Sequence, residues 1–519
     1  MAHGKSQPLI PQTPSRKLPP LTPHFALGAL AFAVYANSLA SGFITDDQFQ
    51  ILNNPVVTGA QNLGSAFGSG VWAFLGYRGN YFRPLQFAIY GLIYRAFGPS
   101  AFAFHLLMVL LHAVNTALVY SLARRLFARR PPAAAWVAAA LFALHPIHTE
   151  AVNWIAALPD VLVTSFALAG LLAFAAQEAA PNAWQRVLHC AIYFAALLTK
   201  ETGVVLPALY AGYQWLRVKR ENVPMYAGMA GAFALYLALR INALGGFAPA
   251  QHTFFQLSGM EFAMSAVALL ARYFAALVWP LGLNFFHVFH ATKGASWQLM
   301  VSLAALAALA WAAVRFGSRD RVAVFAGLWM VFSIAPALDI TGVGQNVFAE
   351  RYLYLPSVGF VILAGLFWVR LADARASWAW PTALAILLVL SMETIARNRD
   401  WKDDFTLLQV TLSQSPDAGY VHNLMAGAWV QRDQFQRALE EESLAVSLEP
   451  RSAVFHKNLG NILLGMDPAA AAREFAAAIA IQPGSAELHR DLGLAYKATG
   501  EAEKAAQEFA RAAAIDKSK

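Results

Sequence analysis

The chain has 519 residues, of which 58% are hydrophobic and 13% are charged. Soluble domains carry about 25% charged residues, so this composition excludes an ordinary soluble domain and indicates an integral membrane protein. The net charge of +8 comes from Lys and Arg in short connections, a pattern typical of cytoplasmic loops and not of a nucleic-acid surface.

The chain starts with a polar, basic, Pro-rich segment that lacks a cleavable signal pattern, so we predict a disordered cytoplasmic tail over 1–23. Apolar stretches near the roughly 17–25 residues of a spanning helix then recur. They predict about eleven transmembrane helices, at 24–39, 104–123, 133–144, 152–176, 187–198, 204–215, 225–241, 297–313, 322–337, 355–368 and 380–395. With the tail inside, the basic loops fall on the cytoplasmic side and the chain leaves the last span outside.

Two further apolar segments do not fit this alternation. The segment 261–280 is apolar enough to span but carries Arg272, and a span there would move a basic loop to the outside. The segment 84–98 is short and ends in aromatic and basic residues. We predict that both are interfacial helices on the outer face, the first of them alternatively re-entrant.

After Arg397 the sequence becomes polar and Ala-rich and repeats with a period of about 34 residues, the tetratricopeptide period. Small residues recur where paired helices must approach, and Pro450 and Pro483 close two turns; the small residues are Ala438, Ala472, Ala505, Gly460 and Gly493. The fold class is therefore all-α: a membrane domain over 24–396 and a short tetratricopeptide solenoid over 397–519. A purely structural cap remains the alternative to a peptide-binding array.

Polar clusters recur on the predicted outer side, where ionisable residues near hydrocarbon are functional candidates. Asp46 and Asp47 follow the first span directly. Two adjacent carboxylates raise each other's pKa, and water relieves the repulsion only if the pair is exposed, so we expect the fold to hold them in place, although a solvated loop would tolerate them equally well. Either could cap a helix, and the other would remain a candidate catalytic base.

His145, His148 and Glu150 have a spacing that could hold a divalent ion, but a metal site usually needs three ligands of defined geometry. The chain's only cysteine, Cys190, excludes a thiolate cluster. We therefore predict no metal and no required cofactor. A hydrogen-bonded network at a helix boundary, where Pro146 breaks the preceding span, is the preferred interpretation.

Lys200 could pair with its neighbour Glu201 or bind a phosphate. Arg351 and Tyr352 could anchor the chain at the interface, but an Arg also offers the fork that suits a phosphodiester. Arg83 is a third cation on the same predicted side, and Asp160 lies in another cluster there.

Several motifs together resemble a known family. They are "FITDDQFQILNNP", "NYFRPLQF", "LFALHPIHTEAVNWIA", "LLTKETGVVLPAL", "AERYLYLPSVGF" and "RNRDWKDDFTLL", followed by the repeats. In this order they resemble the transmembrane and tetratricopeptide-repeat-containing protein O-mannosyltransferases, which belong to the GT-C class of membrane glycosyltransferases that use polyprenyl-phosphate-linked sugars.

The resemblance implies roles for the residues named above. One of Asp46 and Asp47, with Asp46 preferred, would be the catalytic carboxylate. The donor phosphate would be bound by Lys200, Arg351, Tyr352 and Arg83. The site-organising residues would be His145, His148, Glu150, Glu201 and Asp160.

The expected function is inverting transfer of mannose or another hexose to a Ser or Thr hydroxyl of a protein. The expected partners are the lipid-linked donor, an acceptor peptide bound by the repeats, and membrane lipids, with no nucleic acid. The expected location is a bacterial inner membrane, with the site and repeats in the periplasm. A lipid or surface-glycan acceptor and a non-enzymatic scaffold remain alternatives, whereas a transporter is disfavoured because no inverted repeat is visible.

Overall fold

The structure is a computed structural model that describes residues 21–76, 79–177, 181–217, 222–247, 255–317, 320–340, 346–374 and 377–517. Within these ranges all regular elements are helical, which confirms the all-α prediction. All but the last residues of the expected tail, 1–23, lie outside the described residues. The chain forms two compact units. Unit 1 comprises Met1–Leu283 and Phe289–Asp403, and unit 2 comprises Asn284–Val288 and Asp404–Lys519.

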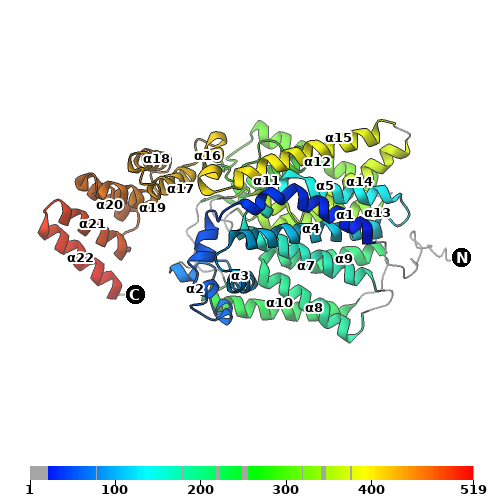
Figure 1. Cartoon of the computed structure of the whole chain (residues 1–519), viewed down its shortest axis with the longest axis horizontal. Helices are drawn as coiled ribbons and strands as arrows, with labels where there is room; N and C mark the ends of the chain where they lie inside the picture. The colour runs from blue at the N-terminus through cyan, green and yellow to red at the C-terminus, as the bar shows by residue number, and fades with distance from the viewer. Residues whose placement is uncertain are drawn as a thin grey trace. The chain divides into compact units, whose positions relative to one another are not determined.

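Unit 1 is a helical bundle in which α4 lies beside α1, α5 and α7 (Figure 1). A helix forms in each of the eleven predicted apolar stretches. The helices of unit 1 are α1 (Leu21–Tyr35), α2 (Pro55–Thr58), α3 (Pro84–Phe97), α4 (Ala101–Leu126), α5 (Pro132–Leu144), α6 (Thr149–Asn153), α7 (Leu158–Ala175), α8 (Ala183–Thr199), α9 (Leu206–Arg217), α10 (Val223–Leu244), α11 (Gly259–Val278), α12 (Trp297–Gly317), α13 (Arg321–Ile334), α14 (Ser357–Asp373) and α15 (Ala379–Asn398).

Seven helical segments in the described part of the chain are long and apolar enough to cross a membrane, so the chain is a multi-pass membrane protein. They contain α4, α7, α10, α11, α13, α14 and α15. Other predicted spans form shorter helices, such as α1 with 15 residues and α9 with 12, and the count of eleven stays a prediction. Residues 261–278 of the segment predicted as interfacial or re-entrant lie in the continuous 20-residue α11, which is among the seven.

The chain between α5 and α7 is the part of unit 1 that shapes the site. Pro146 cannot continue α5, and a 3-10 turn, Pro146–His148, begins where the His145 side chain accepts a hydrogen bond from the Ile147 backbone N–H. Two further short pieces follow, α6 and the 3-10 turn Ile155–Ala157. The predicted span 152–176 therefore starts as irregular buried backbone, and its helix begins at Leu158.

Unit 2 consists of helices that pack in consecutive antiparallel pairs, α17 with α18, α19 with α20, and α21 with α22. Its helices are α16 (Asp404–Gln414), α17 (Gly419–Val430), α18 (Phe435–Leu448), α19 (Ala453–Leu464), α20 (Pro468–Ile481), α21 (Ala486–Ala498) and α22 (Ala502–Lys517). A Cβ atom at Gly460 would lie 2.6 Å from the Phe475 ring, and one at Gly493 would lie 2.7 Å from the Phe509 ring. The close approach predicted at these two glycines is confirmed.

Each helix pair carries the same histidine link. The imidazole Nε2 of His422 donates to the Pro416 carbonyl at 3.0 Å, and its Nδ1 lies 2.6 Å from a Glu441 carboxylate oxygen. The same link recurs as Pro450–His456–Glu474 and Pro483–His489–Glu508. The repeat in sequence is thus a repeat in hydrogen bonding, in which each histidine ties a turn to the second helix of its pair.

Candidate active site

Three cations from distant parts of unit 1 form one cluster. Arg83 precedes α3, Lys200 follows α8, and Arg351 lies in a 3-10 turn before α14. The charges of Arg83 and Arg351 both act on the Lys200 ammonium. The structure therefore brings together the three basic residues that the sequence proposes as phosphate ligands.

Each cation of the cluster has one carboxylate partner. Lys200 donates to Asp160, Arg351 donates to Glu150, and Arg83 lies 3.5 Å from Glu201. The backbone N–H of Arg351 also donates to Glu150, at 3.0 Å. These six groups carry three positive and three negative formal charges, and such a balance is what burial of an ion cluster requires.

The pairing of Lys200 with its neighbour Glu201, considered from the sequence, is not found. The backbone at Lys200 is extended, with φ −156° and ψ 144°, so consecutive side chains point in different directions. The Lys200 side chain reaches Asp160 on α7, while Glu201 reaches Arg83.

Aromatic rings surround the three cations. The Lys200 ammonium lies 4.9 Å from the centre of the Tyr352 ring, and the Arg351 guanidinium lies 4.8 Å from the same ring. Arg351 also lies over Trp154, at 4.8 Å, and Arg83 lies over Tyr81, at 4.7 Å. These contacts favour the charged form of the cations and fix the planes of the guanidinium groups.

The electrostatics of the cluster set the protonation of its members. The pKa of Lys200 is lowered to about 8, chiefly by burial and also by the charges of Arg83 and Arg351, while Asp160 opposes the shift. Burial raises the pKa of Glu150, and Arg351 counteracts that effect. The pKa of Tyr81 is raised to about 12, chiefly by burial, so this phenol stays neutral at physiological pH.

The loosest pair of the cluster is the one between Arg83 and Glu201. Its distance of 3.5 Å is the longest of the three, and the Glu201 side chain is 33% exposed. Within the described residues, the buried Arg83 Nε and Glu201 Oε1 atoms have no hydrogen-bond partner. A buried donor without a partner costs free energy, so Arg83 Nε marks the place where an acceptor oxygen of a ligand would fit.

The two adjacent aspartates have different environments. Asp47 is fully buried, and its carboxylate accepts from the Ala156 backbone N–H at 2.7 Å and from the Ile44 N–H at 3.2 Å. Asp46 is only half-buried. Backbone N–H groups replace water around the Asp47 charge, so this carboxylate is accommodated without exposure. Its bonds tie the 42–54 segment to the turn before α7, and they leave Asp46 as the more accessible carboxylate.

The aspartates lie on the same side of unit 1 as the cations. The Tyr90 hydroxyl donates to the Ile155 carbonyl at 2.6 Å, next to the Ala156 N–H that binds Asp47. The charges of Asp46, Asp47 and Arg83 all act on this hydroxyl. Tyr90 therefore joins the two acidic residues to the edge of the cation cluster.

The two histidines of the 145–154 segment point into the bundle and away from the cations. The His145 Nε2 bonds the Leu277 carbonyl at 3.0 Å, and His148 bonds the Phe142 carbonyl and the Ser357 hydroxyl, each at 2.9 Å. Burial lowers the pKa of His145 to about 4, so its ring is neutral. No group of three His, Cys, Asp or Glu side chains among the described residues could hold a metal ion. The absence of a metal and of any required cofactor stays a prediction.

The sequence reasoning did not single out Arg397, which fixes the loop that carries Arg351. Arg397 bonds Glu350 at 3.0 Å and the Thr149 hydroxyl at 3.1 Å, and both partners are fully buried. It thereby joins the end of α15 to the two segments that supply Glu150 and Arg351. Its position in the motif "RNRDWKDDFTLL" could have pointed to Arg397 as a site residue. In the same way, "NYFRPLQF" contains Tyr81 and "LFALHPIHTEAVNWIA" contains Trp154.

A family model described as dolichyl-phosphate-mannose-protein mannosyltransferase matches residues 83–241, which include Arg83, Asp160 and Lys200. The Mus musculus protein O-mannosyl-transferase TMTC3 is 24% identical over 476 residues, covering 82% of this chain and 51% of the relative. The Caenorhabditis elegans protein O-mannosyl-transferase F38B6.6 is 26% identical, covering 76% of this chain and 58% of the relative. The chain is similar to the TMTC protein O-mannosyltransferases.

The similarity covers only part of each relative. The chain spans about half the length of the curated relatives named above. The Drosophila melanogaster Tmtc2 protein is 35% identical, but over 36% of this chain and 21% of the relative. A crystal structure of MamA covers 31% of this chain and 89% of MamA at 19% identity, with a TM-score of 0.22 that supports no structural argument. The comparisons therefore give similarity to these transferases, and the residues of the site must supply the chemistry.

Proposed function

We propose that the chain is an inverting membrane glycosyltransferase, which moves mannose or another hexose from a polyprenyl-phosphate carrier to a Ser or Thr hydroxyl of a protein. The observation that carries this proposal is the cation cluster of Arg83, Lys200 and Arg351, with Tyr352 between two of its members. Phosphate oxygens are the acceptors that suit such a cluster, and the kinship with protein O-mannosyltransferases supports a sugar as the transferred group.

A phosphate can enter the cluster at the Arg83–Glu201 pair. An anion near Arg83 would find the unpartnered Nε donor and would displace only a long, part-exposed contact. Arg351 and Lys200 would remain paired with buried Glu150 and Asp160 and would act on the phosphate through their net field. Removing these two carboxylates would instead leave buried cations unpaired, which is costly.

The reaction is a single displacement. The acceptor oxygen forms a bond to the anomeric carbon as the bond from that carbon to the phosphate oxygen breaks, and polyprenyl phosphate leaves with the bonding electrons. The hydroxyl proton passes to Asp46 acting as general base, an effect typically worth roughly 10² to 10⁴ in rate. The three cations stabilise the second negative charge on the leaving phosphate, so this chemistry requires no metal and no general acid.

The proposed setting is a bacterial inner membrane with about eleven spans. Most of the site residues lie outside the seven candidate spans, in the connections around 42–54, 79–83, 145–154, 199–205 and 346–355, and Asp160 lies in the first turn of α7. Under the positive-inside rule these connections face the periplasm, as does unit 2. Residues 397–519 would then form a periplasmic tetratricopeptide solenoid that holds the acceptor protein near the site.

The test is release of free polyprenyl phosphate by purified protein in proteoliposomes, with a panel of polyprenyl-phosphate sugars and with or without acceptor peptides. Asp46→Asn and Lys200→Ala should abolish release, whereas the matched control Asp373→Asn, at an exposed end of α14, should not change it. Release that continues unchanged in Asp46→Asn would contradict the proposed base. No release with any donor would favour a non-enzymatic scaffold.

A further inference from the structure

Several buried polar atoms near the Arg83–Glu201 pair have no hydrogen-bond partner within the described residues. They are Arg83 Nε, Glu201 Oε1, the Tyr236 hydroxyl and Asn80 Oδ1. Buried polar atoms are paired in most proteins, because leaving one unpaired costs free energy. A concentration of such atoms beside one ion pair therefore indicates a polar ligand that supplies the missing hydrogen bonds.

Tyr236 belongs to this group because it lies beside the ion pair. The charges of Glu201 and Arg83 both act on its hydroxyl. Its ring centre lies 6.1 Å from that of Phe82, the residue before Arg83 in the chain. The Tyr236 side chain comes from α10, whereas the ion pair comes from the segments before α3 and after α8. Three separate parts of unit 1 thus meet at these unpartnered atoms.

Asn80 is held against the same face of α10. The Arg240 Nη2 group donates to the Asn80 carbonyl oxygen at 2.6 Å, and Arg240 lies four residues after Tyr236 on α10. Residues four apart share one face of a helix, so the face that carries Tyr236 meets the segment that carries Asn80 and Arg83. The Asn80 amide can bind a hydroxyl in either orientation of its oxygen and nitrogen.

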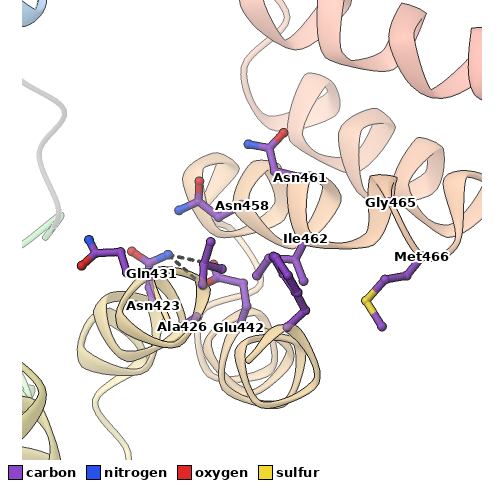
Figure 2. Close-up of a pocket in the computed structure, with 12 residues that line it drawn as sticks. Asn423, Ala426, Gln431, Glu442, Asn458, Asn461, Ile462, Gly465 and Met466 are labelled. Carbon is purple, nitrogen blue, oxygen red and sulfur yellow. Dashed lines mark hydrogen bonds between the residues drawn. The ribbon is translucent and has the colours of Figure 1, made fainter. Parts of the chain in front are cut away.

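A buried carboxylate in unit 2 shows what Glu201 lacks. Glu442 on α18 is 1% exposed, and the Asn423 Nδ2 group donates to both of its oxygens, at 2.8 and 2.9 Å (Figure 2). Glu201 contacts a cation through Oε2 alone, at 3.5 Å, and Oε1 has no donor among the residues that the structure describes. The Glu201 side chain is 33% exposed, so a ligand can reach it from outside.

Binding of the donor phosphate at Arg83 increases this need. Once the phosphate takes the Arg83 guanidinium, Glu201 loses its cation and lies beside a second anion, which is unfavourable. A phosphodiester and a polyprenyl chain have no O–H or N–H group to offer the carboxylate. The sugar is the one part of the donor that carries hydrogen-bond donors, and it is attached directly to the phosphate.

We infer that Glu201, Tyr236 and Asn80 bind hydroxyl groups of the donor hexose next to its phosphate. The inference rests on the proposed function because it takes the ligand to be a polyprenyl-phosphate sugar. Glu201 accepts a hydrogen bond from one hydroxyl, and Tyr236 and the Asn80 amide bind others. Glu201 also makes the bare carrier phosphate a poorer ligand than the donor, because that product brings a negative charge and no hydroxyl, and this difference favours product release.

The experiment measures donor binding by the full chain in lipid nanodiscs, with no acceptor present. The parent protein carries Asp46→Asn so that the donor is not hydrolysed. The probes are polyprenyl-phosphate mannose, its monodeoxy analogues at each hydroxyl, and polyprenyl phosphate. Each probe displaces a fluorescent polyprenyl-phosphate mannose, and the readout is its dissociation constant.

The Glu201 variants provide the decisive comparison. In the parent, removal of the hydroxyl that Glu201 binds should weaken binding about tenfold or more, because a hydrogen bond to a charged group is lost. In Glu201→Ala the same analogue should bind within about twofold of the mannose donor, and polyprenyl phosphate should bind about tenfold more tightly than to the parent. That tighter binding also shows that the variant is folded. Glu201→Gln keeps an acceptor oxygen and should retain part of the discrimination.

The two neutral residues are tested in the same way. Tyr236→Phe removes one hydroxyl and keeps the ring, so binding of the mannose donor should weaken by roughly threefold to tenfold. This loss should disappear when the analogue lacks the hydroxyl that Tyr236 binds. Asn80→Ala should behave alike with another analogue. Tyr94→Phe, at a half-buried tyrosine on α3 outside this group, is the matched control and should change no dissociation constant.

Two results would overturn the inference. One is equal binding of the mannose donor and all its monodeoxy analogues by the parent, which is expected if only water occupies these positions. The other is discrimination in Glu201→Ala that matches the parent. Either result would leave the proposed function intact, since the donor still binds. A parent that binds no donor at all would overturn the proposed function together with this inference.

Discussion

The protonation of Lys200 gives the proposed reaction a defined alkaline limit. The pKa of Lys200 is lowered to about 8, chiefly by burial. Its protonated fraction is then about 0.9 at pH 7 and about 0.1 at pH 9. Because the charge is lost as pH rises, we expect kcat/KM for the sugar donor to fall about tenfold between these two pH values, since kcat/KM reports the free enzyme.

The assay is initial release of polyprenyl phosphate at low donor concentration, across roughly pH 6.5 to 9.5. Lys200→Arg is the matched control because a guanidinium remains charged throughout this range. Tyr81 cannot produce the decline, since its pKa is raised to about 12. A wild-type profile that stays flat to the alkaline end, or an identical decline in Lys200→Arg, would refute the assignment of Lys200 to the donor phosphate.

Three further predictions concern stability and the division of roles. Arg351→Met removes the guanidinium that pairs with buried Glu150, so the free energy of unfolding should fall by about 3 to 5 kcal/mol and the melting temperature in detergent should fall with it. Adding Glu150→Gln should restore part of this loss. An unchanged melting temperature in Arg351→Met would contradict the prediction. Glu442 keeps its proton to about pH 7 when folded but loses it near 4.5 when unfolded, so the free energy of unfolding falls as pH rises through this window. Glu442→Gln should therefore slow hydrogen exchange in α17 and α18 at pH 8, where the free energy of opening should rise by up to about 3 kcal/mol, and it should have little effect at about pH 5. Equal effects at both pH values would contradict this prediction. Asp47→Asn should lower the melting temperature because it weakens the bonds from the Ile44 and Ala156 N–H groups, whereas Asp46→Asn should abolish turnover without changing the melting temperature. Equal melting temperatures and equal turnover in the two variants would contradict this division of roles.

The positions of the helices could be predicted because local hydropathy determines them. An apolar stretch such as 225–241 has few alternatives to a helix when no water can pair its backbone. Whether a helix crosses the membrane depends on length and neighbours, which is why α1 and α9 are short helices at places where full spans were expected.

The members of the site were predictable, but their pairings were not. Residue type and motif order identified Arg83, Lys200 and Arg351, because buried or interfacial charges are rare without a role. Which carboxylate each cation contacts depends on α7 and α8 lying together, and nothing local to "TKETG" encodes Asp160 as the partner of Lys200. The surroundings of Asp47 could not be predicted for the same reason, since the N–H groups that replace its water include one 109 residues away along the chain.

The most direct test of the account is a measurement of both products of one reaction. Purified protein in proteoliposomes would receive polyprenyl-phosphate mannose and a Ser- and Thr-containing peptide, and free polyprenyl phosphate and mannosylated peptide would be counted together. The account predicts equal amounts of the two products, an inverted anomeric configuration, and loss of both in Asp46→Asn. Carrier release without mannosylated peptide, or retained configuration, would contradict it.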